Sequence, residues 1–274
     1  MVDQLEQKLQ QSNPLIMGIV NITPDSFADG GKYNAYDKAM TRIETLIQQG
    51  ADIIDLGAES TRPGAAEVSE EIELSRLRPI LESYQDYFDV PLSLDTRKAE
   101  VAELGLKHNV SIINDISGLT HDSRMCDVIK RYDAWVVIMH MQQTPQNMQD
   151  NPHYNDVIKD INSFFKNQID TLKALKRNKI ILDPGIGFGK TLEHNLTIIK
   201  QFDQFKKHKL PLLIGTSNKS FIGQLTHQPV AKRGGGTVAS SLLACQKGAS
   251  IVRVHDVELL KNAILVYNEL KEHV

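Results

Sequence analysis

Residues 15–22 read LIMGIVNI, an apolar run that stops at Asn21 and gives way to the polar, glycine-rich stretch TPDSFADGG. Short runs of this kind, rich in β-branched residues, recur along the chain with helix-like segments between them. The other seven are ADIIDLGA (51–58), PLSLDT (91–96), SIINDIS (111–117), AWVVIMH (134–140), KIILDPG (179–185), LPLLIGTS (210–217) and SIVRVHD (250–256). Runs this continuously hydrophobic are typical of strands buried on both faces, as in a parallel sheet.

The segments between the runs carry apolar residues at helical spacing, as in YDKAMTRIETLIQQG (36–50) and DVELLKNAILVYNELKE (256–272). Gly50 and Gly248 follow such segments, where the end of a helix favours a residue with positive φ. Eight strand-then-helix units in about 250 residues predict an α/β fold, a (β/α)8 barrel or TIM barrel. A doubly wound open sheet uses the same units, but their even size favours the closed barrel.

No linker, low-complexity tract or run of charges divides the 274 residues, so we expect one domain over residues 1–274, with residues 1–13 as a polar extension. The formal net charge is −3, without the basic character of a nucleic-acid-binding domain. The N-terminus lacks the apolar stretch of a secretory signal, and no run approaches the roughly 18 apolar residues of a membrane span. Cys126 and Cys245 have no CxxC partner, which suits a reducing compartment. We expect a cytoplasmic protein that binds neither nucleic acid nor a membrane.

The C-terminal ends of the strands meet at one rim of such a barrel, where active sites of this fold lie. Nearly every predicted strand ends with a side chain that can hydrogen-bond or carry a charge. They are Asn21, Asp55 with Glu59 and Thr61, Asp95, Asn114, His140, Asp183, Ser217 with Lys219, and Arg253 with His255. Any one of them could simply cap the following helix. The mixture of carboxylates, amides and cations on one rim indicates a ligand site instead.

Two chemical groups are suggested by this rim. Asp95, Asn114 and Asp183 offer the acceptors and donors that a planar polar heterocycle, such as an aminopyrimidinone, would pair with. Positive charge at the same rim suits a phosphate group. The cations are Lys219, Arg253 and His255. Asn21 supplies a neutral oxygen, a plausible ligand for a Mg²⁺ ion held mostly by phosphate and water.

Two motifs that suggest other sites do not hold up. GIGFGKT (185–191) resembles a phosphate-binding P-loop, but Pro184 stands where that motif requires glycine. The nine histidines show no zinc-ligand spacing, and there is no cysteine pair. KRGGGT (232–237) is better explained as a flexible turn into the next helix than as a dinucleotide-binding fingerprint, because no strand directly precedes it. The irregular segment 141–156 is either an active-site loop or a surface excursion.

Several segments together resemble the successive signatures of the dihydropteroate synthase family, in order and spacing. They are GIVNITPDSFADGG (18–31), GAESTRPGA (57–65), LSLDT (92–96), INDISG (113–118), VIMHMQ (137–142), LDPGIGFGK (182–190), GTSNKSFIGQL (215–225) and VRVHDV (252–257). The resemblance implies a folate-pathway transferase. It joins 6-hydroxymethyl-7,8-dihydropterin pyrophosphate to p-aminobenzoate, with Mg²⁺, and releases 7,8-dihydropteroate and pyrophosphate. The resemblance also implies that the protein forms a homodimer and that it is the target of sulfonamides.

The resemblance also assigns roles to residues. Asn21 is similar to the Mg²⁺ contact. The pterin cradle corresponds to Asp95, Asn114, Asp183 and Lys219, and the pyrophosphate side to Thr61, Arg253 and His255. Asp95, Lys219, Arg253 and His255 are the expected catalytic residues. The loops with Asp25, Ser26, Phe27, Arg62 and Pro63 resemble two that close over the second substrate, and Phe188 and Ser220 match positions beside the aminobenzoate.

One position departs from the family pattern, because Asn218 stands where arginine is common. Any anionic contact made there is in doubt. Three rival functions remain open. A barrel of the methyltetrahydrofolate methyltransferase type shares the pterin cradle but needs neither RVHD nor STRPG. An aldolase would form a Schiff base at Lys219, for which the sequence shows no desolvated pocket. The third rival is a non-catalytic barrel.

Overall fold

The computed structural model describes residues 2–10, 13–23, 32–61 and 64–272. Within them, eight strands form one parallel sheet in the order β6-β5-β4-β3-β2-β1-β8-β7. The strands are β1 (Leu15–Asn21), β2 (Ile53–Gly57), β3 (Leu92–Asp95), β4 (Ile112–Asp115), β5 (Trp135–Met139), β6 (Ile180–Asp183), β7 (Leu213–Ile214) and β8 (Ile251–Val254). A parallel bridge between Leu182 and Leu212 joins β6 to the residue before β7 and closes the ring. The predicted (β/α)8 barrel is confirmed, and the fold is not the open sheet.

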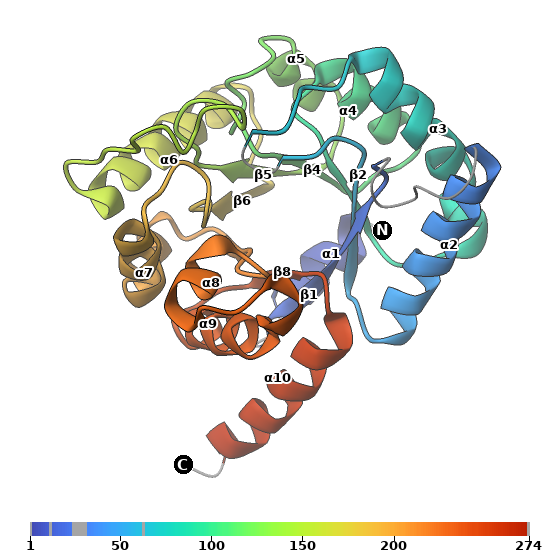
Figure 1. Ribbon diagram of the computed structural model, residues 1–274. Helices are drawn as coiled ribbons and strands as arrows, with labels where there is room; N and C mark the ends of the chain where they lie inside the picture. The colour runs from blue at the N-terminus through green and yellow to red at the C-terminus, as the bar shows by residue number, and fades with distance from the viewer. Residues whose placement is uncertain (1, 11–12, 24–31, 62–63, 273–274) are drawn as a thin grey trace.

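Helices surround the strands (Figure 1). They are α1 (Val2–Leu9), α2 (Lys32–Gln48), α3 (Glu70–Tyr87), α4 (Ala99–Lys107), α5 (Met125–Arg131), α6 (Val157–Ala174), α7 (Leu192–Lys200), α8 (Ser220–Thr226), α9 (Gly234–Gln246) and α10 (Val257–Glu272), with the 3-10 turns η2 (Phe202–His208) and η3 (Val230–Lys232). Gly50 and Gly248 have φ of 97° and 103°, as the helix-end pattern predicts. The prediction that KRGGGT (232–237) is a turn before the next helix is wrong in its bounds, because residues 234–237 are already the first turn of α9 and only Lys232 and Arg233 precede it.

Alternation along each strand separates two buried surfaces. Side chains such as Ile54, Leu94 and Val252 point outward and pack with the helices in the large core. The intervening side chains point into the barrel. At its N-terminal end they are apolar and form a separate cluster. Its strand members are Leu15, Met17, Ile53, Ile112, Trp135, Val137, Ile181, Leu213 and Ile251.

Helix α1 fills the N-terminal end of the barrel. Leu5 is fully buried in the inner apolar cluster, and Val2 and Leu9 pack against it. The following strand is tied to the same end, because a carboxylate oxygen of Asp52 accepts the Ile16 N–H at 3.0 Å. The N-terminal segment, expected only as a polar extension, therefore contributes apolar side chains to the barrel interior. Its alternation of apolar and polar residues forms a helix with one buried side.

The described part of the chain contains no helix that is both long and apolar enough to cross a membrane. Cys126 and Cys245 are free thiols, half-buried against the core. Burial raises the pKa of Cys245 to about 12, so this thiol is unreactive, as expected.

Candidate active site

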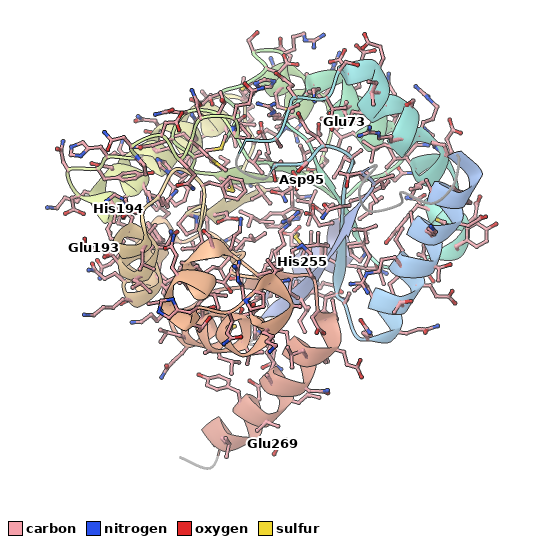
Figure 2. The ribbon with its side chains drawn as sticks, in the orientation of Figure 1. Glu73, Asp95, Glu193, His194, His255 and Glu269 are labelled. Carbon is pink, nitrogen blue, oxygen red and sulfur yellow. The ribbon has the colours of Figure 1, made fainter. Side chains whose placement is uncertain are left out.

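The inner face of the barrel changes from apolar to polar near the C-terminal ends of the strands. Two residues after Ile53, on the same face of β2, comes Asp55, and Arg253 follows Ile251 in the same way on β8. Asp95, Asn114 and Asp183 lie near the C-terminal ends of β3, β4 and β6, and Asp95 and Asn114 are direct partners in the sheet register. Figure 2 shows Asp95 and His255 inside the ring of helices, whereas Glu193 and His194 lie out on α7.

A network of charged side chains spans four strands at this level. Arg253 donates through Nε to Asp55 at 2.6 Å and through Nη2 to Asp95 at 2.8 Å. Asn114 Nδ2 lies 3.2 Å from Asp55 Oδ2. Asp55 and Asn114 are almost completely buried, while the Arg253 side chain keeps 20% exposure. The Arg253 guanidinium is therefore held in place by two carboxyl groups, while part of the side chain remains exposed.

These polar residues do not cap helices, the bland alternative for each of them. The helices α3, α6 and α7 are capped by Ser69, Asp156 and Thr191 instead. Asp183 has a local role, because Oδ1 accepts the Gly185 N–H at 2.7 Å. Its other oxygen is left for a different partner. The interpretation as a ligand site is favoured.

Burial sets the protonation of the cluster. It raises the pKa of Asp95 to about 7, because the charge of Arg253 offsets only part of the desolvation cost. It raises the pKa of Asp183 to about 6, against the Gly185 amide and Lys219. For Arg253, burial acts to lower the pKa, but Asp55 and Asp95 outweigh it and the pKa is raised. Arg253 is thus a permanent cation close to Asp95 and Asp183, whose pKa values burial raises toward neutrality.

Lys219 and Phe188 form the opposite wall of the site. The Lys219 Nζ lies 3.9 Å from the centre of the Phe188 ring, a cation–π contact. Burial, together with the charge of Arg253, lowers the pKa of Lys219 to about 8. Phe188 is 8% exposed and packs with Ile116, Met139 and Met148. The Phe188 ring thus belongs to a small hydrophobic cluster and also contacts the Lys219 ammonium group through its face.

The remaining predicted residues lie around the same rim. His255 follows β8, and its Nδ1 lies 3.0 Å from Ser217 Oγ. Asn21 is the last residue of β1 and is half-buried, as is Thr61 after β2. Ser220 is exposed and is the first residue of α8.

A family model described as "Pterin binding enzyme" matches residues 17–255. A curated relative, the dihydropteroate synthase of Synechocystis sp., is 43% identical over 258 residues, covering 93% of this chain and 89% of the relative. The chain belongs to the dihydropteroate synthase family of pterin-binding enzymes.

Solved structures of this family share the fold. Yersinia pestis dihydropteroate synthase with a sulfonamide drug aligns with TM-score 0.90 and 42% identity, over 95% of each chain. The Xanthomonas albilineans enzyme with 4-aminobenzoic acid aligns with TM-score 0.89 and 36% identity, over 96% of this chain and 94% of that one. The same enzyme with 7,8-dihydropteroate aligns with TM-score 0.86 and 34% identity, over 96% and 95%. Like these family members, the chain is an enzyme, a transferase.

Part of the predicted site lies outside the described residues. These positions are Asp25, Ser26, Phe27, Arg62 and Pro63, on the two loops that the family resemblance assigns to the second substrate. What the structure does describe is the neighbouring segment, which Glu59 anchors. Glu59 accepts the Val68 N–H at 3.1 Å and pairs with Arg97 at 3.2 Å and Lys98 at 2.9 Å.

Sequence reasoning recorded Asp55 at the rim but left it out of the assigned site, because no family role was matched to it. The structure places it at the centre, between Arg253 and Asn114. The signal was present in the sequence, since Asp55 lies two residues after Ile53 on an inward-facing strand position. Lys190 was considered only within the rejected P-loop. It is 3% exposed and lies against His140.

Two sequence-based interpretations change. Asn218 adopts a left-handed φ of 60°, a conformation that asparagine tolerates better than most residues. Its carbonyl accepts from Arg233 Nη1 at 2.9 Å, so a cation reaches this turn from α9 instead. Lys219 is half-buried, and desolvation together with the charge of Arg253 lowers its pKa to about 8, a feature that the sequence did not reveal. The aldolase rival is set aside by family membership.

Proposed function

We propose that the enzyme joins 6-hydroxymethyl-7,8-dihydropterin pyrophosphate to p-aminobenzoate, and that 7,8-dihydropteroate and pyrophosphate are the products. One observation carries this proposal. The C-terminal end of the barrel brings buried carboxyl and amide groups together with a fixed guanidinium and a lysine of lowered pKa. The first set suits a polar heterocycle, and the second suits the phosphates attached to it.

The pterin would lie on the carboxyl groups. Asp183 has one oxygen occupied by the Gly185 amide and the other available to accept N–H groups of an aminopyrimidinone edge. Asp95 lies across the barrel, held by Arg253. Since burial raises the pKa of both groups, each carboxylate interacts strongly with a positively charged or donating ring.

The leaving pyrophosphate would lie toward Arg253 and His255. Two carboxylates keep the Arg253 guanidinium charged and in place, so no reorganisation is needed when negative charge builds on the departing oxygen. Ser217 Oγ, 3.0 Å from Nδ1, orients the His255 ring at the same rim, on the side where the phosphates would lie.

The structure is consistent with a Mg²⁺ ion carried mainly by the substrate. Among the described residues, no three His, Cys, Asp or Glu side chains gather into a metal site. Asn21 offers a single neutral oxygen at the end of β1, which fits an ion whose other ligands are phosphate and water. Such an ion would neutralise charge on the pyrophosphate as it leaves.

The reaction then needs no nucleophile from the protein. The p-aminobenzoate nitrogen forms a bond to the pterin methylene carbon, the bond from that carbon to the pyrophosphate oxygen breaks, and the nitrogen releases a proton. The side chains hold the two reactants in line and stabilise charge. The Asp95 carboxylate would stabilise positive charge that develops on the pterin ring.

The homodimer implied by the resemblance is also a proposal. Most of the large apolar side chains that are exposed in the described residues lie in the C-terminal quarter of the chain. They are Leu225, Val230, Leu243, Leu259, Leu265, Val266 and Leu270. A second copy covering α8, η3, α9 and α10 would remove this surface from water. Sedimentation of the full chain tests it, with a monomer at micromolar concentration as the contrary result.

A turnover assay tests the function. The enzyme is incubated with both substrates and Mg²⁺, dihydropteroate is detected by mass spectrometry, and pyrophosphate is measured separately. We expect equal amounts of the two products and none when either substrate is left out. A chelator should slow turnover, and added Mg²⁺ should restore it. Methyl transfer from methyltetrahydrofolate, or pterin binding without product, would overturn the proposal.

A further inference from the structure

Lys190 is a buried lysine that has no part in the reaction described above. Burial lowers its pKa to about 7, so it is an ammonium ion below neutral pH. Its Nζ lies 2.9 Å from the Phe188 carbonyl oxygen, 3.1 Å from the His140 carbonyl oxygen and 3.2 Å from His140 Nδ1. Burial and the charge of Lys190 lower the pKa of His140 to about 2, so this imidazole is neutral and Nδ1 can accept. Three acceptors match the three N–H groups of an ammonium ion.

The carbonyl that Lys190 binds belongs to the turn of residues 185–189. Gly185, Gly187 and Gly189 all have positive φ, so the turn exposes its backbone. A side-chain carbon at Gly185 would collide with the His140 carbonyl, which shows how closely the turn approaches the end of β5.

Three successive carbonyls of this turn each accept a hydrogen bond from a side chain. Gly187 accepts from Gln149 Nε2 at 2.8 Å and Gly189 from Tyr154 Oη at 2.8 Å, with Phe188 bound to Lys190 between them. Gln149 and Tyr154 belong to the irregular segment 141–156. This segment is therefore a support for the turn rather than only a surface excursion.

The side chain of the turn faces the site. The Phe188 ring carries the Lys219 ammonium on its face, so a displacement of the turn would move both groups. We propose that Lys190 is a positioning residue, which fixes the turn so that Phe188 supports Lys219. This inference rests on the proposed function, because Asp183 and Phe188 take their roles from it.

Loss of the Lys190 charge should also change the pKa of Asp183 in a defined direction. Titratable groups from several elements surround or act on the ammonium group. They are His140 after β5, Tyr154 in segment 141–156, Asp183 on β6, His194 on α7 and Lys219 before α8. Lys190 and Lys219 both act to lower the pKa of Asp183. Without Lys190, the pKa of Asp183 rises and its carboxylate is lost at a higher pH.

Three variants test the proposal. Lys190→Met removes the charge and the donors, Lys190→Arg keeps the charge, and Lys200→Met on the exposed end of α7 is the matched control. We expect K190M to raise KM for p-aminobenzoate between about tenfold and a hundredfold, as misplaced contacts do. The acid limb of kcat/KM for the pterin substrate should move up by about one pH unit. K190R should keep the wild-type acid limb, and K200M should match the wild type throughout.

A second measurement is independent of turnover. The rate at which an amine-modifying reagent labels Lys219 is followed by mass spectrometry in each folded variant. Faster labelling in K190M, with no change in K200M, supports the displaced turn. A lower Tm in K190M, with unchanged KM, acid limb and labelling of the folded enzyme, would overturn the proposal. If the wild type makes no dihydropteroate while labelling still responds to K190M, the proposed function fails and the positioning of Lys219 stands.

Discussion

The two ends of the barrel interior are built from the same strands but from opposite chemistry. At the N-terminal end the inward side chains are apolar, fully packed, and covered by Leu5 of α1. Two residues further along β2 and β8, the inward side chains are Asp55 and Arg253, and Asp95 of β3 joins them through an ion pair with Arg253. The step from Ile53 to Asp55 is one period of a strand, yet it crosses from core to site.

This difference separates stability from function along a single strand. Apolar burial at one end stabilises the fold, whereas burial at the other end places ionisable groups where water would normally solvate them. The polar layer is tolerated because each charge has a partner. Substitutions at the two levels should therefore have opposite signatures, one in unfolding and the other in turnover.

The largest effect is expected from the apolar layer. Ile53→Ala should lower the free energy of unfolding by about 2–5 kcal/mol, because it opens a cavity where the side chain is fully buried. The kcat of the folded enzyme should change little. Chemical denaturation measures the loss, with Ile72→Ala on the exposed side of α3 as the control, expected within about 0.5 kcal/mol of wild type. An equal loss of kcat would show that the two layers are not separable.

The polar layer should respond in the reverse manner. Asp95→Asn keeps the shape of the side chain but removes the charge paired with Arg253. It should cost about 2–4 kcal/mol of transition-state stabilisation with a Tm near that of wild type. Steady-state kinetics provide the measurement, and Asp133→Asn at an exposed position is the matched control. Normal kcat in D95N would remove Asp95 from the mechanism.

Phe188 lies between the two cases, since it is both packed and in contact with Lys219. As a site residue, Phe188→Ala should raise KM for p-aminobenzoate about tenfold, roughly one lost aromatic contact, with a small change in Tm. As a core residue it should cost about 3–5 kcal/mol of stability and leave KM unchanged. Measuring KM and Tm on the same preparation decides between the two.

The smallest effect concerns pH. The pKa of Asp95 is about 7 in the fold and about 3.9 in an unfolded chain, so between these values the folded state binds more protons. The stabilising contribution of the protonated group is present below about pH 4 and is lost as pH rises through 7. The unfolding free energy of wild type relative to D95N should therefore decline over this interval. A relative stability that rises with pH would show that the ion pair with Arg253 prevails over burial.

The strands, the closed barrel and most of the rim could be predicted because strand periodicity and chain order fix which side chains face inward. Asp95, Asn114, Asp183 and Arg253 follow from that rule, and Asp55 satisfies it as well. Leu5 could not be placed, since a short helix with polar neighbours does not reveal what covers it. Lys190 was missed because its partners are backbone carbonyls of a glycine turn, which have no signature in the sequence. Asn218 needed its φ angle to be understood.

The packing of α1 against the inner apolar cluster closes the N-terminal end of the barrel. Whatever rests on Asp95 and Asp183 must arrive from the open side and leave by it. A site with a single entrance releases its contents in the reverse of the order in which they entered. If the pterin rests on Asp95 and Asp183 as proposed, it would enter before p-aminobenzoate, and the joined product would have to leave before the next cycle begins. The closed N-terminal end would therefore set the order of substrate entry and product release as much as the affinities at the rim do.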